Sequence, residues 1–104
     1  MATIRVYVYK DPGFIDSYKV YPPLVVLSRN DKFELVNTVS EHDAFLTIPG
    51  DPFEGGPIKG EKIPPKSRSG QKTPRNVLLA TEYEVKVDGK KASGNSDPVI
   101  IIDP

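Results

Sequence analysis

The chain has 104 residues, the size of a single domain, and its lack of cysteine excludes disulfides, thiolate metal sites and cysteine nucleophiles. Its 14 basic and 14 acidic residues cancel, so we expect neither nucleic acid nor a membrane surface as a partner. The longest apolar runs, residues 24–27 and 98–102, are too short to span a membrane. The first residues lack the basic and apolar regions of a signal peptide, so we expect a soluble, cytoplasmic domain.

The N-terminal residues alternate as a strand does. Val6 and Val8 face one side, while Tyr7 and Tyr9 face the other. Residues 11–13, Asp-Pro-Gly, predict a turn because proline presets φ and glycine permits a tight reversal. A first strand followed by a chain reversal is therefore expected.

The next part of the chain predicts four more strands. Residues 17–20 form a short one, which the Pro22-Pro23 pair ends because proline cannot donate to a ladder. Residues 24–27 are an apolar run, and residues 32–37 and 44–48 alternate between apolar and polar side chains. Polar turn residues separate these runs, which indicates antiparallel neighbours.

Residues 49–74 differ from the rest, because they hold six of the 11 prolines and five of the eight glycines. We interpret them as a long crossover loop with at most one short strand or helical turn, either a solvated loop or a basic patch for phosphate or acidic groups. No aromatic residues are interleaved among its cations to stack bases, which disfavours single-stranded nucleic acid. The residues of this possible binding loop are Phe53, Lys59, Lys62, Lys66 and Arg68.

The C-terminal part carries the clearest amphipathic strand, in which Tyr83, Val85 and Val87 alternate with charged residues. Asp88-Gly89 predicts a hairpin turn, and residues 95–98 predict a second turn. Residues 99–102 are uniformly apolar, which predicts a central strand covered on both faces.

Seven or eight short strands without a helical period predict an all-β fold, a two-sheet antiparallel sandwich. We expect one domain over residues 1–104. Its expected core consists of Ile4, Val6, Phe33, Leu35, Leu46, Tyr83, Val85, Ile100 and Ile102.

The order of these segments resembles the cupredoxins, the copper proteins related to plastocyanin and azurin. The matching segments are residues 23–27, 33–37, 80–85 and 98–103, together with His42, which follows Asn37 by five residues. The resemblance implies a Greek-key topology, with His42 at the position of the family's first copper-ligand histidine.

The remaining copper ligands of the family are missing. On the family pattern, Val87 stands where the cysteine belongs and Lys90 where the second histidine belongs, and the only methionine is Met1. A blue-copper site requires two imidazoles and a thiolate. The resemblance therefore implies a copper-free cupredoxin-like protein with no cofactor.

His42 lies between Glu41 and Asp43, and this trio could hold zinc or copper(II) weakly or tune a general base. Adjacent side chains of an extended chain point to opposite faces, so a surface or capping histidine is the simpler interpretation. No nucleophile elbow, zinc-protease motif or phosphate loop occurs. We expect a non-catalytic module that binds a protein partner or self-associates; the alternative is a weak metal-binding protein or metal-dependent enzyme using His42 with Glu41 or Asp43.

Overall fold

The structure is a computed structural model that describes residues 2–13, 17–92 and 97–104. These residues form eleven β-strands and no helix, which confirms the all-β prediction. Among them there is consequently no helix able to cross a membrane. In chain order the strands are β1 (Thr3–Lys10), β2 (Tyr18–Tyr21), β3 (Leu24–Ser28), β4 (Lys32–Asn37), β5 (Ala44–Ile48), β6 (Ile58–Ile63), β7 (Ser67–Arg68), β8 (Leu79–Glu82), β9 (Glu84–Val87), β10 (Lys90–Lys91) and β11 (Val99–Asp103).

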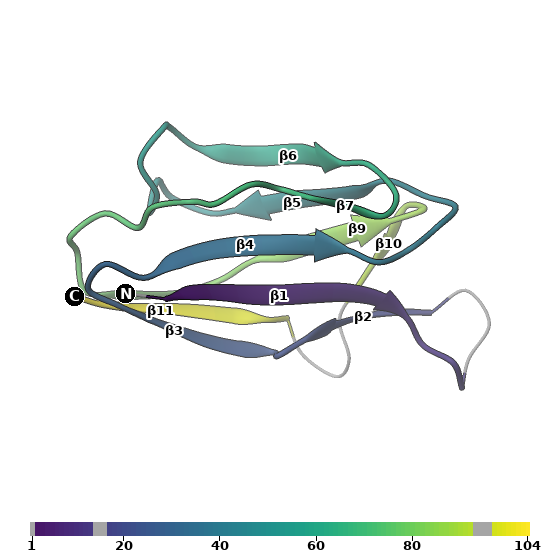
Figure 1. The fold of residues 1–104 in the computed structure, drawn as a ribbon, viewed down its shortest axis with the longest axis horizontal. Coiled ribbons are helices and arrows are strands. Elements are labelled where there is room, and N and C mark those ends of the chain that lie inside the picture. Colours follow the sequence, from purple (N-terminus) through teal and green to yellow (C-terminus); the bar gives the residue numbers. More distant parts are fainter. Residues whose placement is uncertain (1, 14–16, 93–96) are drawn as a thin grey trace.

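The strands form three sheets. Sheet A has the order β2-β1-β4-β7, sheet B the order β3-β11-β8, and sheet C the order β10-β9-β5-β6. Only Tyr83 separates β8 from β9, so sheets B and C follow one another along this part of the chain. In Figure 1, β1 and β4 of sheet A lie in front of β9 and β11, which gives a sandwich-like arrangement with the N- and C-terminal ends together at the left.

The prediction of a two-sheet antiparallel sandwich with seven or eight strands needs correction. The described residues form eleven strands in three sheets, and two of the strand pairs, β1 with β4 and β3 with β11, are parallel. Side-chain alternation indicates which face of a strand is buried but not which strand lies beside it. The two-residue strands β7 and β10 are also too short to produce a periodic pattern.

The expected core is confirmed in nearly all its members. Ile4 is only partly buried, and the other eight predicted residues are each at most 2% exposed. At the centre, the centroid of the Phe33 ring lies 5.6 Å from that of Phe53 and 6.1 Å from that of Tyr83. This aromatic cluster joins β4 of sheet A to Phe53 and to Tyr83, the residue between β8 and β9. Burial raises the pKa of Tyr83, whose hydroxyl has no hydrogen-bond partner within the described part of the chain.

Residues 49–74 are more ordered than the crossover loop predicted for them. They contain two strands, β6 and β7, and isolated bridges join Phe53 to Pro74 and Phe33 to Lys72. Lys72 also forms an ion pair of 2.6 Å with Glu61. The alternation of β6 is hidden because every residue between its buried ends is polar or glycine, including Gly60 in a positive-φ conformation.

Two predicted turns are confirmed. In the first, the amide of Gly13 donates to Asp11 Oδ1 at 2.9 Å, and this bond, followed by the Lys19 ammonium, holds the pKa of Asp11 below its usual range. In the second, Asp88 and Gly89 both have positive φ, as a two-residue hairpin between β9 and β10 requires. Of the turn expected at residues 95–98, residues 95 and 96 lie outside the described residues.

Candidate functional site

His42 lies in the connection between β4 and β5, next to the β9–β10 hairpin. Its Nε2 atom is 3.9 Å from Oδ2 of Asp88, and its ring meets that of Tyr18 edge to face, 6.4 Å away between centroids. Asp88 directly follows Val87, and Val87 pairs in register with Lys90. The three positions that the cupredoxin resemblance relates to copper ligands therefore lie at the same end of the molecule.

Asn37 fixes the chain around this end. Its side chain is fully buried, and Nδ2 donates to the carbonyl oxygens of His42, Ile63 and Pro64 at 3.0, 3.1 and 3.2 Å. Its Oδ1 accepts a hydrogen bond of 3.0 Å from the amide of Val39. One amide group thus connects the end of β4 to the loop that carries His42 and to the end of β6.

The chemistry available near His42 is limited. Among the residues that the structure describes, no group of three or more histidine, aspartate or glutamate side chains is placed to hold a metal ion. Glu41 and Asp43 are therefore not brought together with His42 as a three-residue ligand set. What the geometry provides is one imidazole beside one aspartate.

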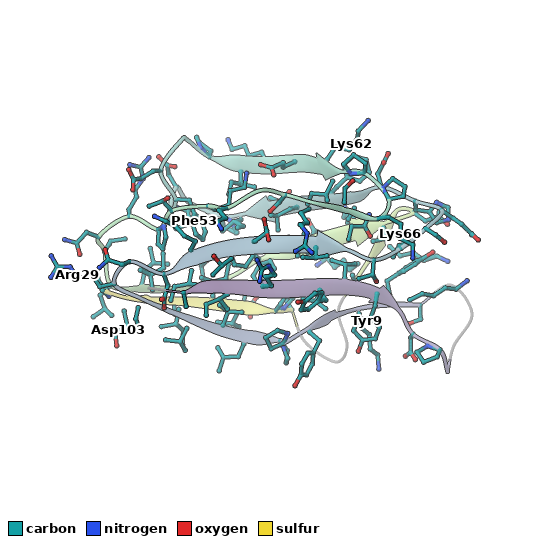
Figure 2. The ribbon with its side chains drawn as sticks, in the orientation of Figure 1. Tyr9, Arg29, Phe53, Lys62, Lys66 and Asp103 are labelled. Carbon is teal, nitrogen blue, oxygen red and sulfur yellow. The ribbon has the colours of Figure 1, made fainter. Side chains whose placement is uncertain are left out.

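The residues of the possible binding loop do not form one patch. Phe53 is fully buried in the core, so it is not a surface contact residue. Arg68 forms an ion pair with Glu34, whereas Lys59 and Lys62 lie exposed on β6. Lys66 is exposed in the connection to β7, and Figure 2 shows it and Lys62 toward the end opposite Arg29. The cationic residues of this loop therefore lie on different elements and do not gather into one binding surface.

A feature that the sequence analysis did not find is the apolar outer surface of sheet B. On β3, Val25 and Leu27 point into the core, while Leu24 and Val26 are 53% and 49% exposed. Because of the register, Val99 and Ile101 of β11 lie beside them and are only half-buried, so the prediction that this strand is covered on both faces needs correction. We call these residues the β3 face; it consists of Leu24, Val26, Ala80, Val99 and Ile101.

Edge strands normally carry features that prevent pairing with other chains, such as charge, shortness or a bulge. Lys19 is on β2, Arg68 on the two-residue β7, and both residues of β10 are lysines. β6 carries two lysines, and its pairing with β5 is interrupted by a register shift. β8 ends in Glu82 and faces the turn at residues 49–52 across an open cleft of about 440 Å³. β3 reads Leu-Val-Val-Leu-Ser and has none of these features. Among the residues that the structure describes, β3 pairs with β11 on one side and with no strand on the other.

The periodicity of the sequence could have indicated this site only in part. Residues 24–27 are visibly apolar, but an apolar run is equally expected of a central strand. That β3 is an edge follows only from its position beside β11. Comparison of the chain with protein-family models gives no match, and no curated protein matches it either.

Proposed function

We propose that this chain is a non-catalytic, copper-free, cupredoxin-like interaction module that joins protein chains edge to edge through β3. The observation that carries the proposal is the unprotected edge of β3 together with its exposed Leu24 and Val26. An exposed apolar edge is a template for strand addition, in which main-chain hydrogen bonds provide affinity and alternate side chains provide specificity.

The occupant that we propose is β3 of a second copy. A two-fold axis brings identical strands together antiparallel, and only the register centred on Val26 pairs all five residues of Leu24–Ser28. In this register Arg29 lies opposite Pro23 of the second copy, so no like charges meet. Because a five-residue pairing buries little surface, we expect a reversible dimer rather than a permanent one.

The absence of cysteine allows a direct test. In the proposed register Val26 lies opposite itself, and opposed residues of an antiparallel pair have Cα atoms about 4.5–5.5 Å apart, within the range that a disulfide spans, so Val26→Cys should oxidise rapidly to a covalent dimer. The matched control is Phe45→Cys, since Phe45 is 40% exposed on β5, a strand with neighbours on both sides. Non-reducing electrophoresis over time compares the two variants.

The second measurement is sedimentation velocity over a concentration series. The wild type should dimerise reversibly, and Val26→Lys should remain monomeric with its circular dichroism unchanged. A wild type that is monomeric at about millimolar concentration, or a Val26→Cys variant that dimerises no faster than Phe45→Cys, would refute pairing through β3.

A further inference from the structure

The outer face of sheet A gathers aromatic and cationic side chains from separate parts of the chain. On β1, Val6 and Val8 are fully buried, so Arg5 and Tyr7 point outward. On β2 the same alternation places Tyr21 outward. We call this surface the tyrosine–arginine face; it consists of Arg5, Tyr7, Lys19, Tyr21, Lys32 and Arg68.

Two tyrosines lie side by side on this face. Tyr7 pairs in register with Tyr21, and opposed residues of an antiparallel pair have Cβ atoms about 4.5–5.5 Å apart. Tyr7 is 41% exposed and Tyr21 is 64% exposed, so their rings are accessible to a ligand. Exposed aromatic rings on a flat sheet are suited to stacking against planar groups.

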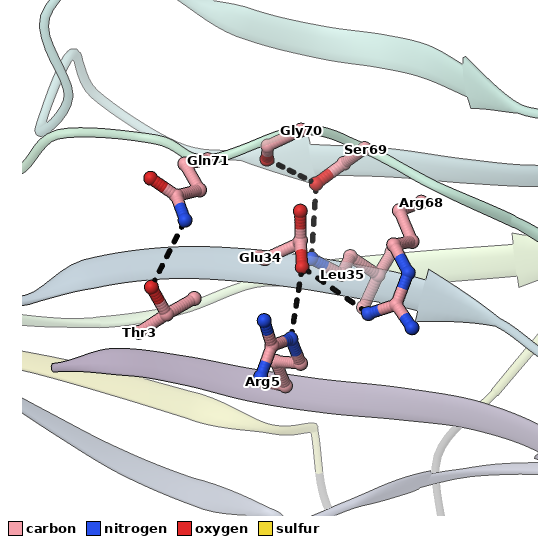
Figure 3. A network of polar contacts seen from close by, with 8 residues as sticks. All are labelled: Thr3, Arg5, Glu34, Leu35, Arg68, Ser69, Gly70 and Gln71. Atoms are coloured by element: carbon pink, nitrogen blue, oxygen red, sulfur yellow. Dashed lines mark hydrogen bonds and ion pairs between the residues drawn. The ribbon is translucent and has the colours of Figure 1, made fainter.

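Two arginines on the same face share one carboxylate, that of Glu34, as Figure 3 shows. Oε1 of Glu34 accepts from Arg5 Nε at 3.0 Å and from Arg68 Nη1 at 3.4 Å. The side chain of Glu34 is only 9% exposed, whereas about half of each arginine side chain is exposed. Since a guanidinium has five N–H donors, each arginine keeps donors for a ligand after binding Glu34.

The segment that carries Arg68 is fixed to sheet A. The amide of Ser69 donates to the carbonyl of Leu35 at 2.8 Å, and Ser69 Oγ accepts from the amide of Leu35 at 2.9 Å. Nearby, Gln71 donates to Thr3 Oγ1 at 3.0 Å. The guanidinium of Arg68 is therefore positioned by the strand next to it rather than by a free loop (Figure 3).

The charge of this face differs from that of the whole chain, which is neutral. Its cations outnumber the acids paired with them, because one carboxylate, Glu34, is shared by two arginines. Lys19 is paired with Asp11 at 3.1 Å, and Lys32 bonds to a neutral group, Thr73 Oγ1. A surplus of positive charge thus lies on the same face as two exposed aromatic rings.

We propose that the tyrosine–arginine face binds single-stranded nucleic acid, with bases stacked on Tyr7 and Tyr21 and phosphates bound by Arg5 and Arg68. Stacking on tyrosines suits any base, and bidentate guanidinium donors suit phosphate oxygens. An acidic peptide would use the arginines but has no planar group for each tyrosine. The earlier expectation of no nucleic-acid partner came from the net charge and from residues 49–74, and neither describes this face.

The test is fluorescence anisotropy with labelled oligouridine and oligothymidine of about twelve nucleotides, which tells RNA from DNA. Tyr21→Ala should weaken binding by roughly 5- to 150-fold, and Tyr21→Phe should retain it, because stacking needs the ring and not the hydroxyl. Arg68→Gln should weaken binding and reduce the slope of log affinity against log salt by about 0.7. The matched controls, Phe45→Ala and Lys62→Gln on sheet C, should bind like the wild type.

Three results would overturn the inference. The first is no saturable binding of either oligonucleotide at about 50 mM salt. The second is an equal loss in Tyr21→Ala and Phe45→Ala. The third is equally tight binding of a sulfated polysaccharide, unaffected by Tyr21→Ala, which would indicate charge attraction alone. Should Tyr21→Ala not fold, amide chemical shifts of the wild type decide: oligouridine should perturb β1, β2 and β7, and shifts confined to other strands refute the site.

Discussion

Asn37 offers the most direct test of how the His42 end is held together. In Asn37→Ala the carbonyls of His42, Ile63 and Pro64 and the amide of Val39 lose a partner. The contacts to Ile63 and Val39 are buried, and each buried backbone group left without a partner costs about 1–3 kcal/mol. For the two groups together we therefore expect the free energy of unfolding to fall by about 2–6 kcal/mol, measured by urea denaturation followed by circular dichroism.

Asn37→Asp gives the same prediction a pH dependence. It places a carboxylate against carbonyl oxygens, which disfavours the ionised form and raises its pKa in the folded state. A group whose pKa is raised in the folded state destabilises the protein as pH increases above its pKa in the unfolded state, which is about 3.9 for aspartate. The deficit relative to the wild type should thus be larger at pH 7 than at about pH 4.

The control is Thr38→Val, which removes a part-buried hydrogen bond of 2.7 Å from Thr38 Oγ1 to the carbonyl of Val8, an oxygen that also accepts from the amide of Thr38 at 3.0 Å. It should cost no more than about 1.5 kcal/mol, because the carbonyl of Val8 keeps the amide of Thr38 as a donor. If Asn37→Ala costs no more than this control, the buried carbonyls do not depend on Asn37 and the reasoning fails.

Three further predictions concern other parts of the molecule. Tyr83→Phe should leave stability unchanged or raise it by up to about 2 kcal/mol, because it removes a buried hydroxyl that has no partner among the described residues; a loss above about 1 kcal/mol would show that the hydroxyl has a partner. The pKa of Asp11 is lowered from 3.8, so the ionised carboxylate contributes fully to the stability of the fold above that value, and this contribution is lost as pH falls. The Asp11→Asn variant should therefore lose less stability than the wild type between about pH 5 and pH 2, and parallel curves of stability against pH would contradict this. Val87→Cys with Lys90→His should create a copper(II) site with visible thiolate charge-transfer absorption that requires His42, and a folded but colourless variant would count against the cupredoxin resemblance.

The faces of the strands could be predicted from the sequence. Phe33, Leu35 and Val85 are buried as their alternation indicated, and the Asp88-Gly89 turn forms the expected hairpin. These features depend on neighbours along the chain, which the sequence displays directly.

Features that depend on which segments meet could not be predicted in this way. The parallel pair of β1 and β4 brings Arg5 beside Glu34, and β7 adds Arg68 from a segment that looked like a loop. Similarly, Tyr7 and Tyr21 become neighbours only through the pairing of β1 with β2. Phe53 is a further case, because a single aromatic residue among prolines and glycines shows no period.

The central place of β11 in sheet B has a consequence for the order of events during synthesis. β11 lies between β3 and β8, so neither strand has its partner until Val99–Asp103 has been made. On the ribosome, β3 and β8 therefore lack their pairing partner until these residues emerge from the exit tunnel. Domains built from such distant pairings fold slowly and are prone to aggregation while incomplete. The apolar side chains of β3 thus stay without their neighbouring strand during the interval between the synthesis of β3 and that of β11.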